Sequence, residues 1–292
     1  MNHANLILFY LIMSALKALI FDVDGTLAET ERDGHRIAFN RAFTAAGDDC
    51  QWSPDEYGAL LEITGGKERL THYFNHLAPA AIATRWAQLS PAAQVELVAT
   101  LHRQKTTYYT ELLATGAIAL RPGVLRLLKE ARAAGLQLAI ATTTTLDNVT
   151  ALFTHAGLAD LIEWFTVIAA GDVVANKKPA PDIFTFAMQH LHCTPAQCVV
   201  IEDSLPGLQA AMAAEIKTVL ITLSYYTRNQ DFTGAALVVD QLGEPTLPVT
   251  IVGGDCADFI HHALGCDDAS LPNYIDLTVL QQLHQQCWQP QS

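Results

Sequence analysis

Residues 19–26 read Leu-Ile-Phe-Asp-Val-Asp-Gly-Thr, an apolar β-type run that ends on two carboxylates and a glycine. Side chains alternate in direction along an extended chain, so Asp22 and Asp24 start on the same side. Gly25 then lets the backbone turn sharply beneath them. The stretch therefore predicts a buried strand with an acidic site at its carboxyl end.

This pair of carboxylates suits phosphoryl transfer. A carboxylate can attack phosphorus to form an aspartyl-phosphate, while a neighbouring carboxyl group handles the leaving-group proton. Crowding raises the pKa of one of the two groups, which favours an ionised nucleophile beside a protonated acid. We assign Asp22 as the nucleophile and Asp24 as the general acid and base. For an isolated Asp-x-Asp, the alternative is a strand end with solvated aspartates.

Two further segments end apolar runs or begin helices with groups that a phosphate site uses. Residues 136–141 run into Thr142, whose hydroxyl and backbone N–H can hold a phosphoryl oxygen. Lys178 precedes a helix-like stretch at 183–190, and its ammonium can neutralise developing charge. The alternatives are an ordinary strand-end hydroxyl and a solvated loop lysine.

A fourth segment supplies more acid. The apolar run at 198–201 ends on Glu202 and Asp203. Together with Asp22 and the backbone carbonyl of Asp24, these acids make the hard oxygen site that Mg²⁺ prefers. The alternative for the last two acids is a helix N-cap.

The four segments, in this order, resemble the motifs of the haloacid dehalogenase superfamily of phosphatases and phosphomutases, over about residues 16 to 240. The resemblance implies Asp22 as nucleophile, Asp24 as acid and base, Thr142 as phosphate binder, Lys178 as charge stabiliser, and Asp22, Asp24 and Asp203 as Mg²⁺ ligands with Glu202 in support. Because all four motifs occur together, the non-catalytic interpretation of each one is much weaker than it would be for a single motif.

The spacing of apolar runs predicts the fold class. Short β-type runs recur, mostly separated by helical stretches, at 18–23, 136–142, 165–170, 198–202, 217–222 and 236–239. This alternation indicates an α/β fold with a doubly wound parallel sheet covered on both faces, a Rossmann-like core. Ligands bind such sheets outside the carboxyl ends of the strands, where all four motifs lie.

The first gap between strands contains only helical patterns. We therefore expect a helical cap domain over residues 33–115, inserted into a core domain that comprises residues 1–32 and 116–292. Ser90-Pro91 is typical of a helix start, with a helix through about Tyr109. A closing cap would exclude water and position the substrate. Residues 243–292 extend beyond the resemblance.

Within the cap, Thr64-Gly65-Gly66-Lys67-Glu68-Arg69 is the stretch most typical of a binding site. Glycines that open a helix expose backbone N–H groups, and Lys67 and Arg69 add positive charge, which suits a second phosphate. The alternative is a glycine turn before an ordinary charged helix.

A more specific resemblance is to the CbbY-type phosphatases of this superfamily. It is carried by Glu29-Thr30-Glu31, His35, Gly65 to Arg69, Ala141 followed by four threonines, and Lys177 to Asp182. These proteins are associated with carbon fixation and remove a phosphate from xylulose 1,5-bisphosphate, a Rubisco inhibitor. The resemblance implies that Lys67 and Arg69 grip the phosphate that stays, that Glu29 and His35 line the site near the sugar, and that Thr142 and Thr143 bind substrate. A histidine on a helix is more often packed or solvated.

Composition limits the partners. The chain has 292 residues, half of them apolar, and a net charge of −13, which argues against nucleic acid or an anionic membrane as a partner. Its six cysteines form no Cys-x-x-Cys pair, which favours free thiols and a cytoplasmic location. The apolar run at 6–12 is too short to span a bilayer, and we expect residues 1–12 to be a leader, with Met13 as the natural start. We also expect a monomer.

The leading hypothesis is a Mg²⁺-dependent phosphatase that acts on a phosphorylated sugar, with xylulose 1,5-bisphosphate as the implied substrate. A phosphomutase of the β-phosphoglucomutase type shares the motifs and the cap, and differs only in whether water or a sugar hydroxyl accepts the phosphoryl group. Dehalogenation would need neither Mg²⁺ nor Asp24. A binding protein on a retired catalytic fold would be expected to lack one of the catalytic groups, and none is missing.

Overall fold

The computed structural model describes residues 15–48, 50–264 and 273–289. The predicted leader at residues 1–12 and the predicted start at Met13 lie outside these ranges, as does Cys266. In the part of the chain that is described, no helix is both long and apolar enough to cross a membrane.

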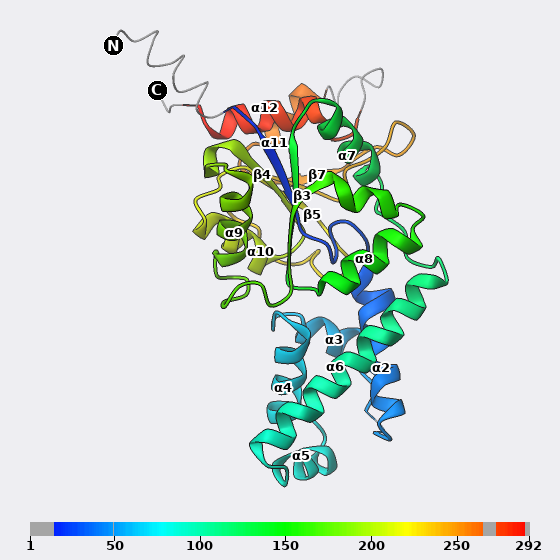
Figure 1. The fold of residues 1–292 in the computed structure, drawn as a ribbon. Coiled ribbons are helices and arrows are strands. Elements are labelled where there is room, and N and C mark those ends of the chain that lie inside the picture. The colour runs from blue at the N-terminus through cyan, green and yellow to red at the C-terminus, as the bar shows by residue number, and fades with distance from the viewer. Residues whose placement is uncertain (1–14, 49, 265–272, 290–292) are drawn as a thin grey trace.

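One seven-stranded sheet forms the centre of the core, with the strand order β3-β2-β1-β4-β5-β6-β7 (Figure 1). Its strands are β1 (Ala18–Phe21), β2 (Gln137–Thr142), β3 (Phe165–Ala170), β4 (Cys198–Glu202), β5 (Val219–Thr222), β6 (Leu237–Val239) and β7 (Ile251–Gly253). The first six are parallel to one another, which confirms the predicted sheet. Strand β7, a short antiparallel strand at the edge beside β6, was not predicted.

Helices cover both faces of the sheet. One face is covered by α9 (Asp182–Leu191) and α10 (Leu205–Ala213), and the other by α7 (Val124–Ala133), α8 (Leu146–His155), α11 (Ala257–Ala263) and α12 (Leu277–Cys287). Alternation along β1 explains the two layers, because Leu19 and Phe21 join one apolar cluster while Ile20 joins the other. Short 3₁₀ turns, η2 (Ala159–Trp164) and η3 (Pro195–Gln197), precede β3 and β4.

The sheet register brings the motifs together. Phe21 of β1 lies level with Ile140 of β2 and with Ile201 of β4, the strands on either side. Asp22 therefore follows β1 at the level where Glu202 ends β4. β1 is also the point where the chain switches between the two halves of the sheet, which is where a crevice for ligand opens.

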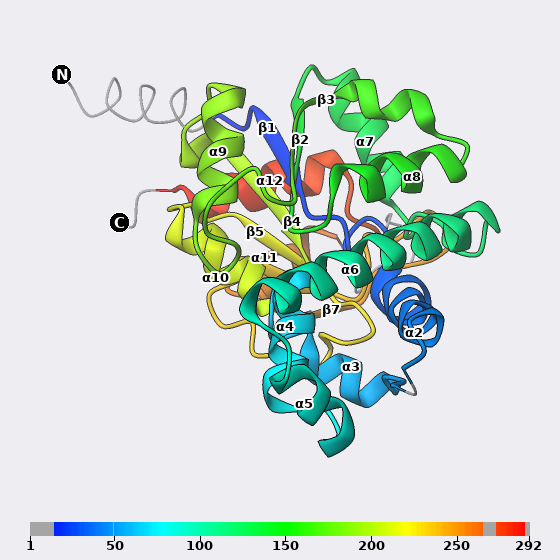
Figure 2. The ribbon, with the colours of Figure 1, turned by 60° about the horizontal axis from the view of Figure 1, so that its bottom comes forward.

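Between β1 and β2 the chain forms a helical unit that lies beyond the carboxyl ends of the strands, below the sheet in Figure 1 (Figures 1 and 2). It comprises η1 (Glu31–His35, a π-helical turn), α2 (Arg36–Ala45), α3 (Pro54–Leu60), α4 (Gly66–His76), α5 (Ala80–Ala87) and α6 (Pro91–Ala114). Its aromatic side chains, Trp52 and Tyr57 among them, form an apolar cluster separate from those of the sheet. The exact cap boundaries at residues 33 and 115 stay a prediction.

Two serine N-caps fix helix starts, and the one at Ser90 was predicted. Ser53 accepts a hydrogen bond from the backbone N–H of Glu56, and Ser90 accepts one from Ala93, each followed by proline at the first helical position. Residues 243–264 and 273–289 contact the core, where Arg126 of α7 donates hydrogen bonds to the carbonyl oxygens of Gly243 and Ile275.

Candidate active site

The first of two adjoining cavities lies where β1, β2 and β4 end. We call it the acidic cavity and define it by Asp22, Thr142, Lys178, Glu202 and Asp203, all of which line it and all of which are buried. Thr143 lines it as well. The structure thus brings together the predicted residues of all four motifs, Asp24 included.

Lys178 joins three of the strand ends. Its ammonium donates hydrogen bonds to Asp22 Oδ1 at 2.7 Å, to Glu202 Oε1 at 2.5 Å and to the carbonyl oxygen of Ala141 at 2.9 Å. Burial works against the charge on this lysine, but the two carboxylates raise its pKa overall. The side chain is a fixed positive charge in direct contact with the proposed nucleophile.

Three acids form a cluster suited to a cation. Asp22, Glu202 and Asp203 have oxygens within 4.8 Å of one another. Burial raises the pKa of Asp22 to about 8 despite Lys178, and burial with the charges of Glu202 and Asp22 holds the pKa of Asp203 well above its usual range. Crowded carboxylates of this kind gain most from a divalent cation.

Glu202 is the most constrained of the three acids. Its Oε2 accepts hydrogen bonds from the backbone N–H groups of Asp203 and Ser204 and from the Ser204 hydroxyl. With Oε1 bound to Lys178, both oxygens already have protein partners. This geometry fits a supporting role better than that of a primary metal ligand.

Two glycines leave room for these acids. A Cβ atom on Gly25 would lie 2.1 Å from a carboxylate oxygen of Asp203, and one on Gly207 would lie 1.9 Å from the carboxyl group of Glu202. Gly25 also has a φ of +87°, in the left-handed region that favours glycine. The acidic cluster therefore depends on close backbone approach from the β1 turn and from α10.

Asp24 is held differently from Asp22. Its Oδ1 accepts a hydrogen bond from Thr30 Oγ1 at 2.5 Å and lies 2.8 Å from His35 Nε2. Burial favours a high pKa, but His35 and Thr30 outweigh it and hold the pKa of Asp24 well below its usual range. We expected an ionised Asp22 beside a protonated Asp24, and the two pKa shifts run the other way, because burial favours the neutral form of Asp22 while His35 and Thr30 favour the charged form of Asp24.

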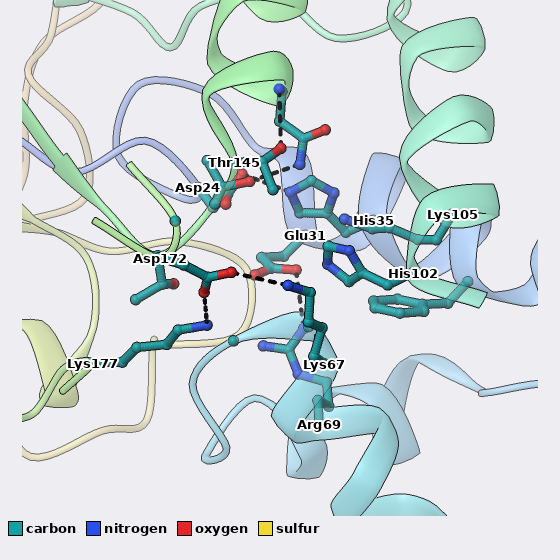
Figure 3. Close-up of a pocket in the computed structure, with 17 residues that line it drawn as sticks. Asp24, Glu31, His35, Lys67, Arg69, His102, Lys105, Thr145, Asp172 and Lys177 are labelled. Carbon is teal, nitrogen blue, oxygen red and sulfur yellow. Dashed lines mark hydrogen bonds and ion pairs between the residues drawn. The ribbon is translucent and has the colours of Figure 1, made fainter. Parts of the chain in front are cut away.

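The second cavity lies between the core and the cap (Figure 3). We call it the basic cavity, and it is lined by Lys67, Arg69, His102, Lys105 and Lys177 together with His35, Asn148, Asp172 and others. Asp24, Glu31, Arg69 and Thr143 line both cavities, so the two adjoin. Lys67, Arg69 and His35 thus lie where a substrate that fills both cavities would meet them.

Each predicted cap residue has protein partners. Arg69 is buried and donates to the carbonyl oxygen of Leu60 and the hydroxyl of Tyr57. Lys67 is half exposed and forms an ion pair with Asp172 of the core at 2.9 Å. His35 is buried against the Tyr109 ring, with 4.1 Å between ring centroids.

Glu29 lines neither cavity. Its Oε1 lies 4.0 Å from Arg121 Nε, and its Oε2 accepts a 3.4 Å hydrogen bond from the backbone N–H of Tyr225. A contact between Glu29 and the sugar therefore stays a prediction. Glu31, two residues on, lines both cavities.

Sequence reasoning missed several residues of the basic cavity, namely Glu31, His102, Lys105, Asn148, Asp172 and Lys177. His102 and Lys105 share a face of α6, and their spacing of three residues was the only available signal. Burial and the charge of Lys105 lower the pKa of His102 to about 3, so its imidazole is neutral. Asp172 and Lys177 belong to the loop after β3, which has no helical or strand periodicity.

Comparisons with known proteins agree with this geometry. Residues 16–215 match the family model described as haloacid dehalogenase-like hydrolase. The protein is a haloacid dehalogenase-like hydrolase. Among its relatives, Protein CbbY of Rhodobacter capsulatus is 48% identical over 75% of this chain and 91% of its own length. Protein CbbY of Cereibacter sphaeroides is 44% identical over 78% of this chain and 94% of its own.

Solved structures place the hydrolase with the same relatives. CbbY from Rhodobacter sphaeroides in complex with phosphate matches with a TM-score of 0.69 and 44% identity, over 83% of this chain and 98% of that one. A mutant of that protein in complex with xylulose 1,5-bisphosphate matches with a TM-score of 0.70 and 43% identity, over the same shares. The predicted family and the predicted phosphatase class are confirmed, and the CbbY proteins are among the chain's relatives.

Proposed function

We propose that the hydrolase removes one phosphate from a sugar bisphosphate, xylulose 1,5-bisphosphate, with Mg²⁺ as cofactor. The observation that carries this proposal is the adjoining pair of cavities, one with a nucleophile and a fixed ammonium, the other lined by several cations. A substrate with a phosphate at each end would place one in each cavity. The CbbY structure with this bisphosphate supports the same substrate by similarity.

Asp22 attacks the phosphorus and forms an aspartyl-phosphate, while Lys178 offsets negative charge on the transferring group. Thr142 is the last residue of β2. Its hydroxyl holds a phosphoryl oxygen of the transferring group. Asp22, Asp203 and the carbonyl of Asp24 would hold Mg²⁺, with Glu202 in support. Bound there, the cation supplies charge neutralisation and favours the ionised form of Asp22.

Asp24 has two roles in this mechanism. It donates a proton to the leaving sugar oxygen and then, as a carboxylate, takes one from the water that hydrolyses the aspartyl-phosphate. Its low pKa in contact with His35 and Thr30 suits the second role. The acid role requires the carboxyl group to leave these two partners, since both favour the charged form.

A phosphate-release screen over sugar monophosphates and bisphosphates, with and without Mg²⁺, tests the proposal. We expect the highest kcat/KM with xylulose 1,5-bisphosphate, and a loss of activity when the cation is chelated. The control is Asp160→Asn, which removes an exposed carboxylate of η2 and should leave activity unchanged. Activity confined to monophosphates would contradict the bisphosphate, and isomerised sugar monophosphate without free phosphate would favour the mutase.

A further inference from the structure

Lys105 is a buried cation without a hydrogen-bond acceptor. It lies on α6 and lines the basic cavity, with a relative exposure of only 4% (Figure 3). Its Nζ lies over the rings of Phe39 and Tyr109, at 5.1 Å and 5.2 Å from their centroids. Within residues 15–48, 50–264 and 273–289, no group accepts a hydrogen bond from it or pairs with it at salt-bridge distance.

Such an arrangement is costly for the protein alone. A buried ammonium loses its hydration, and contacts with ring faces replace only part of it. Burial accordingly lowers the pKa of Lys105 to about 8, although the charges of Asp24 and Glu31 oppose this shift. A neutral side chain would pack at this position at a lower cost in folding free energy. The charge of Lys105 is therefore better explained by binding of a ligand than by a contribution to stability.

The other cations of the cavity are already engaged. Lys67 and Lys177 both pair with Asp172, and Arg69 donates to a carbonyl and a hydroxyl. Lys105 is the one lysine or arginine of the cavity lining for which the described residues provide no partner.

Two more polar atoms of this lining lack partners. His35 Nδ1 and Asn148 Oδ1 are buried and have no hydrogen-bond partner in the described part of the chain. His35, Asn148 and Lys105 come from η1, α8 and α6, so three separate elements direct unpaired polar groups to one cavity. Convergence of this kind is what a polar ligand requires.

We propose that Lys105 is a specificity-determining residue, which donates hydrogen bonds to the phosphate of the substrate that is not transferred. The inference rests on the proposed function and adds to it the residue that distinguishes a bisphosphate from a monophosphate. A phosphate dianion supplies both the charge and the acceptors that this ammonium lacks. A sugar hydroxyl would supply an acceptor but leave the buried charge uncompensated.

The test measures how anions inhibit hydrolysis of p-nitrophenyl phosphate, a monophosphate ester that needs only the acidic cavity. The inhibitors are xylulose 1,5-bisphosphate, ribulose 1,5-bisphosphate and inorganic phosphate. The variants are Lys105→Met, which keeps an unbranched apolar stem between the two rings, and Lys105→Arg, which keeps the charge. Lys129→Met, at an exposed position on α7, is the matched control.

For Lys105→Met we expect the inhibition constants of the bisphosphates to rise by about 10- to 100-fold, the loss of a charge-assisted hydrogen bond. The inhibition constant of inorganic phosphate should stay within about twofold, because phosphate alone occupies only the acidic cavity. Lys105→Arg should bring the inhibition constants of the bisphosphates part of the way back towards the wild-type values. Lys129→Met should change neither these constants nor that of inorganic phosphate. Melting curves verify that each variant folds.

If Lys105→Met weakened inhibition by bisphosphates and by inorganic phosphate equally, the proposal would be overturned, because Lys105 would then act on the reacting groups through Asp24. Unchanged inhibition would overturn it as well, and so would a wild-type protein that binds bisphosphates no better than inorganic phosphate. Failure of the proposed function is seen separately, as strong inhibition by bisphosphates from which no phosphate is released.

Discussion

The acidic and basic cavities adjoin but are built in opposite ways. Asp22, Thr142 and the Glu202-Asp203 pair of the acidic cavity lie at the ends of neighbouring parallel strands, whose register sets their relative positions, and Lys178 reaches them from the loop after β3. The basic cavity is lined by helices η1, α4 and α6 of the cap and by the loop after β3. The sheet therefore fixes the chemistry, while helix packing and loop contacts between cap and core shape the part that selects the substrate.

Electrostatics follow the same division. In the acidic cavity the oxygens of three carboxylates lie within 4.8 Å of one another, while the Lys178 ammonium pairs with only two of them, so negative charge is in excess. Lysine and arginine side chains predominate in the basic cavity, and Lys105 lacks a counter-charge at short range. A cation in the first and an anion in the second would relieve both, which is why we regard the two as halves of one site.

The strongest test of the division removes the nucleophile. In Asp22→Asn, phosphate release should fall by on the order of 10⁴-fold or more, since loss of a covalent nucleophile removes the main reaction path. Inhibition by bisphosphates at the basic cavity should persist. Steady-state kinetics and competition assays measure the two effects, and appreciable turnover by this variant would contradict the assignment of Asp22.

Its fold should survive, because the substitution removes a charge from a crowded buried cluster and leaves Lys178 paired with Glu202. The melting temperature in the absence of divalent cations should equal or exceed that of the wild type. A large decrease would mean that Asp22 has a structural role.

A second test disturbs the acidic cavity through α10, which packs against Glu202. Gly207→Ala would place a methyl group 1.9 Å from the Glu202 carboxyl group, so Glu202 and then Lys178 must shift. We expect a loss of activity of about 100-fold and of stability of about 1–3 kcal/mol, as for other overpacked buried sites. Kinetics and thermal unfolding measure both. The control is Gly253→Ala, where an added Cβ meets nothing within 4 Å, and equal effects of the two substitutions would refute the steric argument.

Predictability from sequence differed between the two cavities for a physical reason. Asp22, Thr142 and Glu202 each end an apolar run of about strand length, and the carboxyl ends of adjacent parallel strands meet. Six strands and the whole acidic cavity were therefore predictable. Strand β7 was not, because a partly exposed three-residue edge strand has too few residues to show alternation.

The basic cavity was predictable only where a glycine pair marked it. Lys67 and Arg69 follow Gly65 and Gly66, which signal a helix start, but Lys105 lies within the 24-residue helix α6. Nothing local distinguishes it from a solvated lysine, since burial depends on how α6 packs against α2. The low pKa of Asp24 was unpredictable for a similar reason, as it requires His35 from a π-helical turn.

A third test uses pH to show the strain in the acidic cavity. The pKa of Asp22 is about 8 in the folded protein against 3.8 ordinarily, so the folded state binds more protons than the unfolded state between these values. Stability without divalent cations should therefore fall as pH rises, by at most about 1.4 kcal/mol per pH unit for this group. His102 and Lys105, whose pKa values are lowered on folding to about 3 and about 8, oppose this fall. Their opposition is small near pH 7.5, where the unfolded histidine is mostly neutral and the folded lysine is mostly charged.

Thermal or denaturant unfolding at several pH values measures the slope. Asp22→Asn should reduce it, and Mg²⁺ should reduce it in the wild type by holding Asp22 ionised. If neither the substitution nor the cation changed the slope of the unfolding free energy against pH, the slope would not come from Asp22.

The smallest effect is expected at the exposed ion pairs that join the cap to the core. Asp172 of the core pairs with Lys67 of the cap and with Lys177, but its side chain is 63% exposed. Asp172→Asn should change stability by less than about 0.5 kcal/mol, as is usual for exposed ion pairs. Because it frees Lys67 and leaves Lys177 paired only with Glu68, it should alter the KM for a bisphosphate by about threefold, with little change in kcat.

Salt distinguishes this cap–core contact from an ordinary surface pair. The KM difference between Asp172→Asn and wild type should vanish at about 0.5 M salt, where exposed charges are screened. The matched control is Glu96→Gln, which breaks an exposed ion pair with Arg103 within α6 and should leave KM unchanged. A change in kcat above about tenfold for Asp172→Asn would mean that this ion pair governs cap closure, and that the basic cavity controls the chemical step as well as the choice of substrate.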